Sequence, residues 1–362
     1  MVFHIFNPEH DMALAFGKPN FTPPHVVRAM RINLGFLPAL WAEKGDVVIV
    51  DDVDYALKAA HKAGRLEEKV LFVTVSEAAR MAAESDPGLV DIQPWGWDEA
   101  VRKQLERACF PQSSLPDHIQ MTLIRNWSNR KTGVALLGNV RKFIPETVGE
   151  SVICTSVDEV ADMCSKYHNA VVKAPWSCSG RGIRYVLGRF EGGMERWLSN
   201  IIDQQGAVTI EPLYHKVLDF GMEFSALGDG TIRYEGLSVF HTENGAYIGN
   251  VITTERRKME RIVKYIPSEL LETVKITLQN ELATLFKGKY VGPLGVDMMV
   301  VLDEGRFLLH PLVEMNLRRT MGHLALAWNA SPIEPERIVR VRDGVNFELH
   351  VKPIENAFVK VL

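Results

Sequence analysis

The sequence of 362 residues is poor in cysteine. Its four cysteines, Cys109, Cys154, Cys164 and Cys178, show neither CxxC spacing nor the dense pattern of a small disulfide-bonded scaffold. This usage predicts free thiols in a reducing compartment, so we expect the protein to be cytoplasmic.

Long apolar runs are missing as well. The strongest of them, such as 70–75 and 298–302, are far shorter than the roughly 20 residues that a membrane-spanning helix needs. The apolar start of the chain lacks a basic flank and stops at Asn7-Pro8, which predicts a first strand and no cleaved signal. We therefore expect no membrane partner.

Neither sign of charge dominates. Lys and Arg total 41 and Asp and Glu total 45, which gives a net charge of −4. The chain thus lacks the basic field that attracts nucleic acids, and we expect no nucleic-acid partner. Hydrophobic residues make up 46% of the sequence, which is a globular composition, and the length predicts two or three packed units.

The first third of the chain alternates short apolar runs with helical patterns. Such alternation predicts a parallel sheet in a doubly wound α/β layer, which we place at residues 1–112. Ser76 is the expected start of one of its helices, although Ala79 stands where a capping box would have Glu. The expected strands are 2–6, 47–50 and 70–75, with a helix over 55–64.

The rest of the chain mixes helices with antiparallel strands, which predicts an α+β arrangement. We place one subdomain at 113–205 and a second, ending in a hairpin around Asp343-Gly344, at 206–362. One helix is expected over 119–132 and a long one over 267–286. The other expected hairpins join 171–174 to 183–187, 222–227 to 232–240 and 296–302 to 307–312.

Lys173 ends a predicted strand and precedes a loop of mostly small residues, 174–182. Small side chains let several backbone N–H groups approach an anion such as a triphosphate, beside the lysine ammonium. The loop matches neither GxxxxGK(S/T) nor GxGxxG, and a tight surface hairpin would have the same composition. On the loop alone, both interpretations stay open.

An acidic pair follows, with Glu211 at a strand end and Asp219 shortly after it. Because Pro212-Leu213 is apolar, the first carboxylate can bound an adenine slot. The second can accept hydrogen bonds from both ribose hydroxyls, as acidic residues do in dinucleotide sites. Solvated carboxylates that flank a loop would give the same pattern.

Asp297 lies in an otherwise apolar strand, and Glu314 and Asn316 follow the next strand at i, i+2, which places them on one face. Oxygen ligands that converge from adjacent strands suit Mg²⁺, which shares its coordination with nucleotide phosphates. The alternative is a buried Asp297 carboxylate paired with Arg318 or Arg319, because unpaired burial is costly.

These features, in this order and spacing, resemble the ATP-grasp superfamily. Residues 173–183 are similar, register for register, to the Gly-rich lid loop of the biotin carboxylase type, and 211–213 are similar to the adenine-binding linker. Residues 292–297 and 314–318 resemble the metal-binding strands. The resemblance covers about residues 120–330, and the preceding α/β unit looks like the domain that precedes the grasp.

The resemblance implies a ligase that uses ATP and Mg²⁺ to activate a small carboxylate as an acylphosphate, which an amine then attacks. Lys173 and an upstream basic residue, Lys131 by position, would hold the phosphates. Arg318 would stabilise the charge of the transferring phosphoryl group. Asp297, Glu314 and Asn316 would bind Mg²⁺, and Ser177, Ser179, Gly180, Gly182, Glu211, Leu213 and Asp219 would contact the nucleotide.

The sequence also departs from the family. Trp176 and Cys178 stand where lid loops of the biotin carboxylase type have glycines, and Leu317 replaces a usual proline. Met321-Gly322-His323 stands where biotin carboxylase has its glutamate base, which argues against bicarbonate-dependent carboxylation. A small residue such as Gly322 is typical of ligases in which this turn approaches the acceptor substrate.

The segment Asn7-Pro8-Glu9-His10-Asp11 follows the first predicted strand, and ligands of such sheets bind outside the carboxyl ends of strands. In proteins that this chain resembles, the first domain helps close the active site, so Glu9 and His10 are candidates for contact with the acceptor. The alternative is a turn in which Asp11 caps the next helix.

Two other functions are compatible with this scaffold: a non-catalytic or regulatory nucleotide-binding protein, and a phosphotransferase without ligation. The intact set of Lys173, Glu314, Asn316 and Arg318 favours the enzyme, because pure binding would tolerate the loss of a metal ligand. The expected partners are small carboxylate and amine substrates, amino-acid-like or peptide-like. Homodimers are common among proteins of this resemblance.

Overall fold

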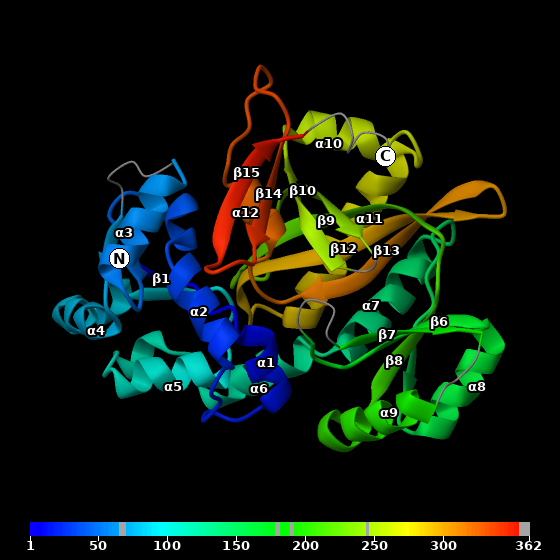
Figure 1. The fold of residues 1–362 in the computed structure, drawn as a ribbon, viewed down its shortest axis with the longest axis horizontal. Helices are drawn as coiled ribbons and strands as arrows, with labels where there is room; N and C mark the ends of the chain where they lie inside the picture. The colour runs from blue at the N-terminus through cyan, green and yellow to red at the C-terminus, as the bar shows by residue number, and fades with distance from the viewer. Residues whose placement is uncertain (65–69, 178–181, 189–191, 244–245, 355–362) are drawn as a thin grey trace. The chain divides into compact units, whose positions relative to one another are not determined.

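The computed structural model describes residues 1–64, 70–177, 182–188, 192–243 and 246–354 (Figure 1). These residues form two compact units whose ranges interleave along the chain. The first unit consists of Met1–Arg125, Gly249–Thr254 and the described residues from Leu317 onward. The second consists of Asn126–Ile248 and Glu255–Asn316. The subdomain boundaries near residues 112 and 205 remain a proposal.

A parallel sheet in the order β3-β2-β1-β4 organises the first unit, as the alternation of strands and helices predicts. The sequence pattern did not predict strand β4 or the helix α5 that follows it. The described strands of this sheet are β1 (Val2–Ile5), β2 (Val47–Ile49), β3 (Leu71–Val73) and β4 (Asp91–Pro94). The helices are α1 (His10–Phe16), α2 (His25–Leu34), α3 (Val53–Lys62), α4 (Val75–Glu84) and α5 (Glu99–Arg107), with 3-10 turns at Leu37–Leu40, Pro87–Leu89 and Gln112–Ser114.

Both faces of this sheet are buried, as is usual for parallel sheets. Successive residues of β2 alternate between two apolar clusters. Val47 and Ile49 pack with Phe3 and Ile5, whereas Val48 packs in the cluster of Phe6, Leu34 and Trp95. Strand β2 therefore needs a continuous apolar sequence, which is what makes it visible in the pattern.

The end of the chain contributes to the first unit. Helix α12 (Met321–Leu326) and the antiparallel hairpin of β14 (Arg337–Arg342) and β15 (Glu348–Pro353) belong to it. The predicted terminal hairpin is confirmed. Strand β11 (Ala246–Ile252) runs antiparallel to β14, with Val251 opposite Ile338.

The second unit contains two antiparallel arrangements (Figure 1). The larger has the order β13-β12-β9-β10, from β9 (Lys216–Leu227), β10 (Ile232–Glu243), β12 (Val291–Asp303) and β13 (Arg306–Asn316). The smaller has the order β5-β8-β6-β7, from β5 (Val152–Cys154), β6 (Asn169–Lys173), β7 (Ile183–Leu187) and β8 (Val208–Pro212). The described helices are α7 (Arg130–Phe143), α8 (Val157–Tyr167), α9 (Gly192–Gln205), α10 (Glu255–Ile262) and α11 (Ser268–Phe286).

The prediction of one helix over 119–132 is wrong. The structure has two helices there, α6 (His118–Trp127) and α7, separated by a break at residues 128–129. Asn129 causes the restart, because its side chain accepts a hydrogen bond from Lys131 N and caps α7. The break makes Arg130 the first residue of α7.

The start that the sequence predicts for α4 is wrong as well. Thr74, and not Ser76, is the N-cap: its side chain accepts a hydrogen bond from Glu77 N, and the Glu77 carboxylate accepts one from Thr74 N (2.9 Å). This is a complete capping box, shifted by two residues from the expected one.

Among the described residues, no helix is both long and apolar enough to cross a membrane.

We predict that Thr74→Ala lowers the free energy of unfolding by about 1 kcal/mol, because α4 loses the cap for its first N–H groups. Ser76→Ala, at an exposed position, should change the free energy of unfolding by less than about 0.5 kcal/mol. Urea titration of both variants, followed by circular dichroism, measures this difference. Equal losses would show that Thr74 does not start the helix.

Candidate functional site

Polar side chains form rows on one face of the larger sheet in the second unit. Asp297 on β12 lies opposite Glu314 on β13, and Gly295 lies opposite Asn316. Residues directly opposite each other in an antiparallel pair share a face, so the register brings together the three predicted metal ligands. Asn316 Nδ2 donates a hydrogen bond to Asp297 Oδ2 (3.0 Å), and both side chains are half-buried.

The same rows continue onto β9 and β10 with residues that the sequence analysis missed. Gly221 lies opposite both Asp297 and Ser238, and Glu223 lies opposite Gly295. Ser238 Oγ donates to Glu223 Oε1 (2.8 Å), and Glu223 is 1% exposed. A Cβ at Gly221 would lie 3.0 Å from Ser238 Oγ and 3.4 Å from Asp297 Oδ1, so glycine keeps room within the row. The alternation of apolar with polar or small residues along β9 is the sequence signal that could have identified Gly221 and Glu223.

Lys173 and Glu211 form a buried ion pair on the smaller sheet. Lys173 is the last residue of β6 and Glu211 belongs to the neighbouring β8, and Nζ lies 2.6 Å from Oε2. The two side chains are 7% and 9% exposed. The attraction is strong enough to keep both charges buried only because donor and acceptor meet directly.

Arg130 is a further residue of this site that the sequence analysis overlooked. Its Nη2 lies 2.8 Å from Glu314 Oε1, and the same nitrogen donates to Ser177 Oγ (3.2 Å). Its Nε donates to Ala174 O (2.9 Å). One guanidinium thus joins the beginning of the small-residue loop to a predicted metal ligand. The Asn129 cap, which orients the start of α7, was the signal that could have identified it.

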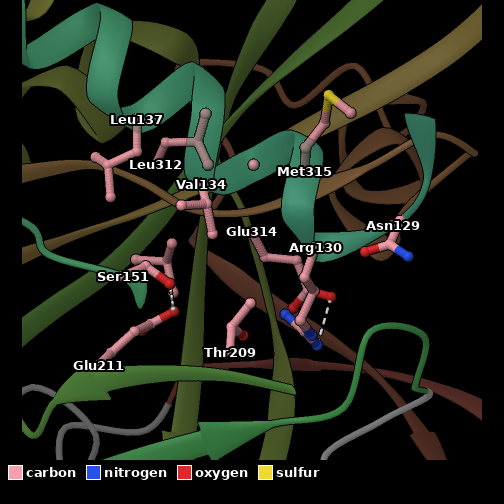
Figure 2. A pocket seen from close by; sticks show the side chains of 12 residues that line it. Asn129, Arg130, Val134, Leu137, Ser151, Thr209, Glu211, Leu312, Glu314 and Met315 are labelled. Atoms are coloured by element: carbon pink, nitrogen blue, oxygen red, sulfur yellow. Dashed lines mark hydrogen bonds and ion pairs between the residues drawn. The ribbon is translucent and has the colours of Figure 1, made fainter. Parts of the chain in front are cut away.

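A pocket of the second unit collects these groups (Figure 2). Figure 2 shows Arg130 and Glu314 paired on one side, with Glu211 and Ser151 paired on the other (3.4 Å). The wall residues come from α7, β8, β13 and the segment before β5: Asn129, Arg130, Gly133, Val134, Leu137, Ser151, Thr209, Glu211, Leu312, Val313, Glu314 and Met315. The pocket is therefore apolar on the α7 side and charged at its ends.

The ends of the predicted phosphate loop meet closely. A Cβ at Gly182 would lie 2.3 Å from Ser177 Cβ and 3.1 Å from Ala174 Cβ, so residue 182 must be glycine for the chain to return there. Ala174 N donates to Gly182 O (2.8 Å) across this closure. The predicted loop residues Ser179 and Gly180, and Cys178 as well, lie outside the described residues.

Other residues predicted to contact the nucleotide lie apart from the pocket walls. The Lys131 side chain is exposed, and that of Leu213 is 37% exposed. Leu213 N donates to Asn169 O (2.9 Å). Asp219, expected in a loop, lies inside β9, where its carboxylate pairs with Lys216 Nζ and accepts from Thr242 Oγ1 (2.6 Å).

The first unit holds the remaining predicted residues. The Arg318 guanidinium pairs with Asp11, with Nη2 2.9 Å from Oδ2. Glu9 Oε1 accepts from Arg31 (2.7 Å), and burial raises the pKa of the Glu9 carboxyl. His10 Nδ1 lies 3.2 Å from Asp98 Oδ2 and is fully buried.

Gly322 lies in the first turn of α12. Its N–H donates to Thr320 Oγ1 (3.1 Å), and His323 completes a capping box with Thr320. Gly322 is buried in this turn. Its backbone is therefore engaged in capping in the structure.

Asp297, Glu314 and Asn316 fit Mg²⁺ in the type of their donor atoms, which are carboxylate and amide oxygens on adjacent strands. Within the described ranges, no group of three or more His, Cys, Asp and Glu side chains is arranged to hold a metal. Mg²⁺ commonly takes one or two carboxylates and completes its coordination with water and substrate phosphates. These three side chains suit that partial coordination.

His310 on β13 is a buried histidine outside every predicted site. It is 1% exposed, and within the described part of the chain neither ring nitrogen has a hydrogen-bond partner. Its ring packs edge-on against Tyr214, and a Cβ at Gly149 would lie 2.7 Å from Nε2. Burial, with Lys173 and Arg141 nearby, lowers the pKa of His310 to about 3. The imidazole is therefore neutral in the folded protein.

The sequence matches no model of a known protein family and no curated protein. Solved structures do share its fold. Biotin carboxylase from Campylobacter jejuni, in a β-γ-ATP complex, aligns with 96% of this chain and 77% of its own, with a TM-score of 0.51 and 11% identity.

Two further solved structures align less closely. N5-carboxyaminoimidazole synthetase from Staphylococcus aureus, complexed with ADP, covers 94% of this chain and 82% of its own (TM-score 0.48, 10% identity). D-alanyl-alanine synthetase A from Vibrio cholerae O1 biovar eltor covers 67% of this chain and 72% of its own (TM-score 0.44, 13% identity).

The chain has the ATP-grasp fold that it shares with biotin carboxylase. The predicted fold, an α/β unit followed by an ATP-grasp arrangement, is thereby confirmed. At 11% identity the similarity to biotin carboxylase concerns the architecture of the chain.

We predict that His310 makes stability depend on pH. An unfolded histidine titrates near 6.5, whereas folded His310 titrates at about 3, so between these values only the unfolded chain binds the proton. Stability therefore falls as the pH drops below about 6.5, by up to about 2 kcal/mol at pH 5. His310→Leu should remove this part of the slope.

Urea unfolding at pH 7 and pH 5, for both the wild type and His310→Leu, measures the difference. The comparison uses the change between the two pH values, so a constant loss of stability in the variant does not affect it. Parallel losses in both proteins would mean that His310 takes up its proton in the folded state.

Proposed function

We propose that this protein is an ATP- and Mg²⁺-dependent ligase that joins a small carboxylate to an amine through an acylphosphate. The observation that carries the proposal is the charge arrangement of one pocket in the second unit (Figure 2). Arg130 and Glu314 meet at one end of it, and Glu211, at the other end, holds the Lys173 ammonium. A triphosphate with a divalent cation requires cationic side chains for its phosphates and a carboxylate for the metal.

In this proposal the nucleotide lies along the pocket. Lys173 contacts the phosphates, together with Arg130 or Lys131, while Ser177, Ser179, Gly180 and Gly182 supply the loop above them. Glu211 and Leu213 lie at the border of the adenine site, and Asp219 accepts hydrogen bonds from the ribose hydroxyls. The competing bonds of Asp219 to Lys216 and Thr242 must then be exchanged for bonds to ribose.

Asp297, Glu314 and Asn316 would hold Mg²⁺, which would neutralise charge on the phosphate oxygens. Because Glu314 pairs with Arg130, the guanidinium must release this carboxylate when the nucleotide and metal bind. Phosphate oxygens then offer Arg130 a new anionic partner. The exchange conserves the number of charge pairs, so it need not cost much free energy.

The proposed reaction has two steps. An oxygen of the substrate carboxylate attacks the γ-phosphorus, the bond to the bridging oxygen breaks, and ADP leaves with that electron pair. The amine lone pair then attacks the acyl carbon, phosphate leaves, and the amine proton passes to solvent. Arg318 would stabilise the charge on the phosphoryl group during the first step. Glu9, His10 and Gly322 are the proposed contacts of the acceptor, and because all three are buried, this proposal requires them to become exposed when the acceptor binds.

Release of ADP from ATP tests this function. The full chain is incubated with ATP, Mg²⁺ and panels of small carboxylates, with and without amines. Release that requires both substrates supports the ligase, and release with phosphorylation of a carboxylate alone indicates a phosphotransferase. ATP binding without any release would indicate a non-catalytic nucleotide-binding protein.

We predict that the double variant Glu314→Gln and Asn316→Ala lowers Mg²⁺-dependent turnover at least about 100-fold, because a carboxylate and an amide ligand are lost together. Glu304→Gln, an exposed carboxylate in the β12–β13 turn, is the matched control and should retain full turnover. Circular dichroism verifies folding. Near wild-type ATP consumption in the double variant would remove these residues from the metal site.

We also predict a difference between two adjacent cations. Arg130→Gln should weaken ATP binding about 10-fold or more, because the pocket loses a guanidinium that faces phosphate. Lys131→Gln, which removes the same charge from an exposed side chain, should change ATP affinity less than about threefold. Calorimetric titration with ATP and Mg²⁺ measures both. A larger loss for Lys131→Gln would assign the phosphate contact to Lys131.

A further inference from the structure

The N-terminal end of α1 is held rigidly within the first unit. Glu9, immediately before the helix, is held by Arg31, and His10 is held by Asp98, which itself caps α5. A Cβ at Gly96 would lie 2.6 Å from the His10 ring, so the chain around this ring is closely packed. The next residue, Asp11, therefore projects from a fixed backbone.

Asp11 forms a bidentate pair with the Arg318 guanidinium. Arg318 Nε lies 3.0 Å from Asp11 Oδ1, and Arg318 Nη2 lies 2.9 Å from Oδ2. This side-on, bidentate pair joins residues 307 positions apart in the sequence. Two parallel hydrogen bonds determine the plane of a guanidinium as well as its position.

The backbone around Arg318 is anchored as well. Arg318 Nη1 donates to Arg319 O (3.0 Å), and Arg319 N donates to Trp95 O (2.8 Å). The Arg319 guanidinium lies over the Trp41 ring, 4.6 Å from its centroid. Both ends of the Asp11–Arg318 pair are thus attached to the core of the first unit.

We propose that Asp11 is a positioning residue that orients the Arg318 guanidinium for phosphoryl transfer. The role rests on the proposed function, in which Arg318, two residues after Asn316, stabilises the transferring group. Both side chains keep about a fifth of their surface exposed (19% and 21%). Partly exposed ion pairs add little to stability, whereas a bidentate pair on rigid supports fixes orientation.

The test compares Asp11→Asn with Asp11→Glu in the full chain, using the substrate pair identified by ADP release. Asp11→Asn keeps the size of the side chain but loses its charge, so kcat should fall about 10- to 100-fold. The KM for ATP should stay within about twofold and the melting temperature within about 3 °C. Asp11→Glu, which restores the charge, should recover part of the lost kcat.

Glu348→Gln is the matched control, because it breaks another long-range ion pair of the same unit, Lys62–Glu348 (2.7 Å). It should leave kcat, KM and melting temperature unchanged. A readout independent of turnover is the solvent exchange of the Arg318 Nε–H proton, followed by NMR and assigned with Arg318→Lys. Asp11→Asn should speed this exchange at least about 10-fold.

The outcomes separate the two levels of the proposal. If the wild type releases ADP and Asp11→Asn retains kcat within about twofold, the positioning role is wrong while the ligase function stands. The same holds if kcat falls only in step with the melting temperature, or if the Nε–H exchange is unchanged. If the wild type releases no ADP with any substrate pair, the ligase function fails and this role fails with it.

Discussion

Buried opposite charges must meet directly, and this constraint governs the second unit. The Lys173 ammonium at the end of β6 can be buried only because Glu211 on β8 faces it at 2.6 Å. The pair thereby joins the end of β6 to the neighbouring β8 at the point where the small-residue loop begins. Removing either partner would leave a buried, unpaired charge, which is among the costliest defects in a protein.

The same constraint acts on the larger sheet, where antiparallel register aligns several carboxylates on one face. Asp297 accepts a hydrogen bond from the Asn316 amide, and Glu223 accepts one from the Ser238 hydroxyl. Glu314 forms an ion pair with Arg130. Each acid is thus matched by a donor from a different strand or helix. A row of acids of this kind needs such donors to be stable without a ligand.

Much of this arrangement could be predicted from the sequence. The apolar strands of the first unit, the long helix α11 and the shared face of Glu314 and Asn316 follow from local periodicity alone. Helix starts were predicted less well, because several residues near one another could serve as caps. Thr74, and not Ser76, is the N-cap of α4 because Glu77 completes a capping box with it. Asn129 caps α7 and thereby divides an apparently continuous helix.

Partners that are distant in sequence could not be predicted. Asp11 had a plausible local role as a cap, and nothing near it in the sequence indicates a guanidinium 307 residues away. His310 is hidden for a similar reason, because nothing near it in the sequence indicates that its ring packs against Tyr214 and Gly149. Such pairings depend on which elements the whole fold brings together.

The interleaving of the two units has a consequence for synthesis on the ribosome. All described residues of the second unit precede Leu317, so this unit can complete its core before the chain is finished. The first unit cannot, because Phe6 and Leu34 share a cluster with Leu324, Val339 and Phe347. One apolar cluster of the first unit therefore stays incomplete until the last part of the chain is made, whereas the other, which contains Phe3 and Leu115, can form early.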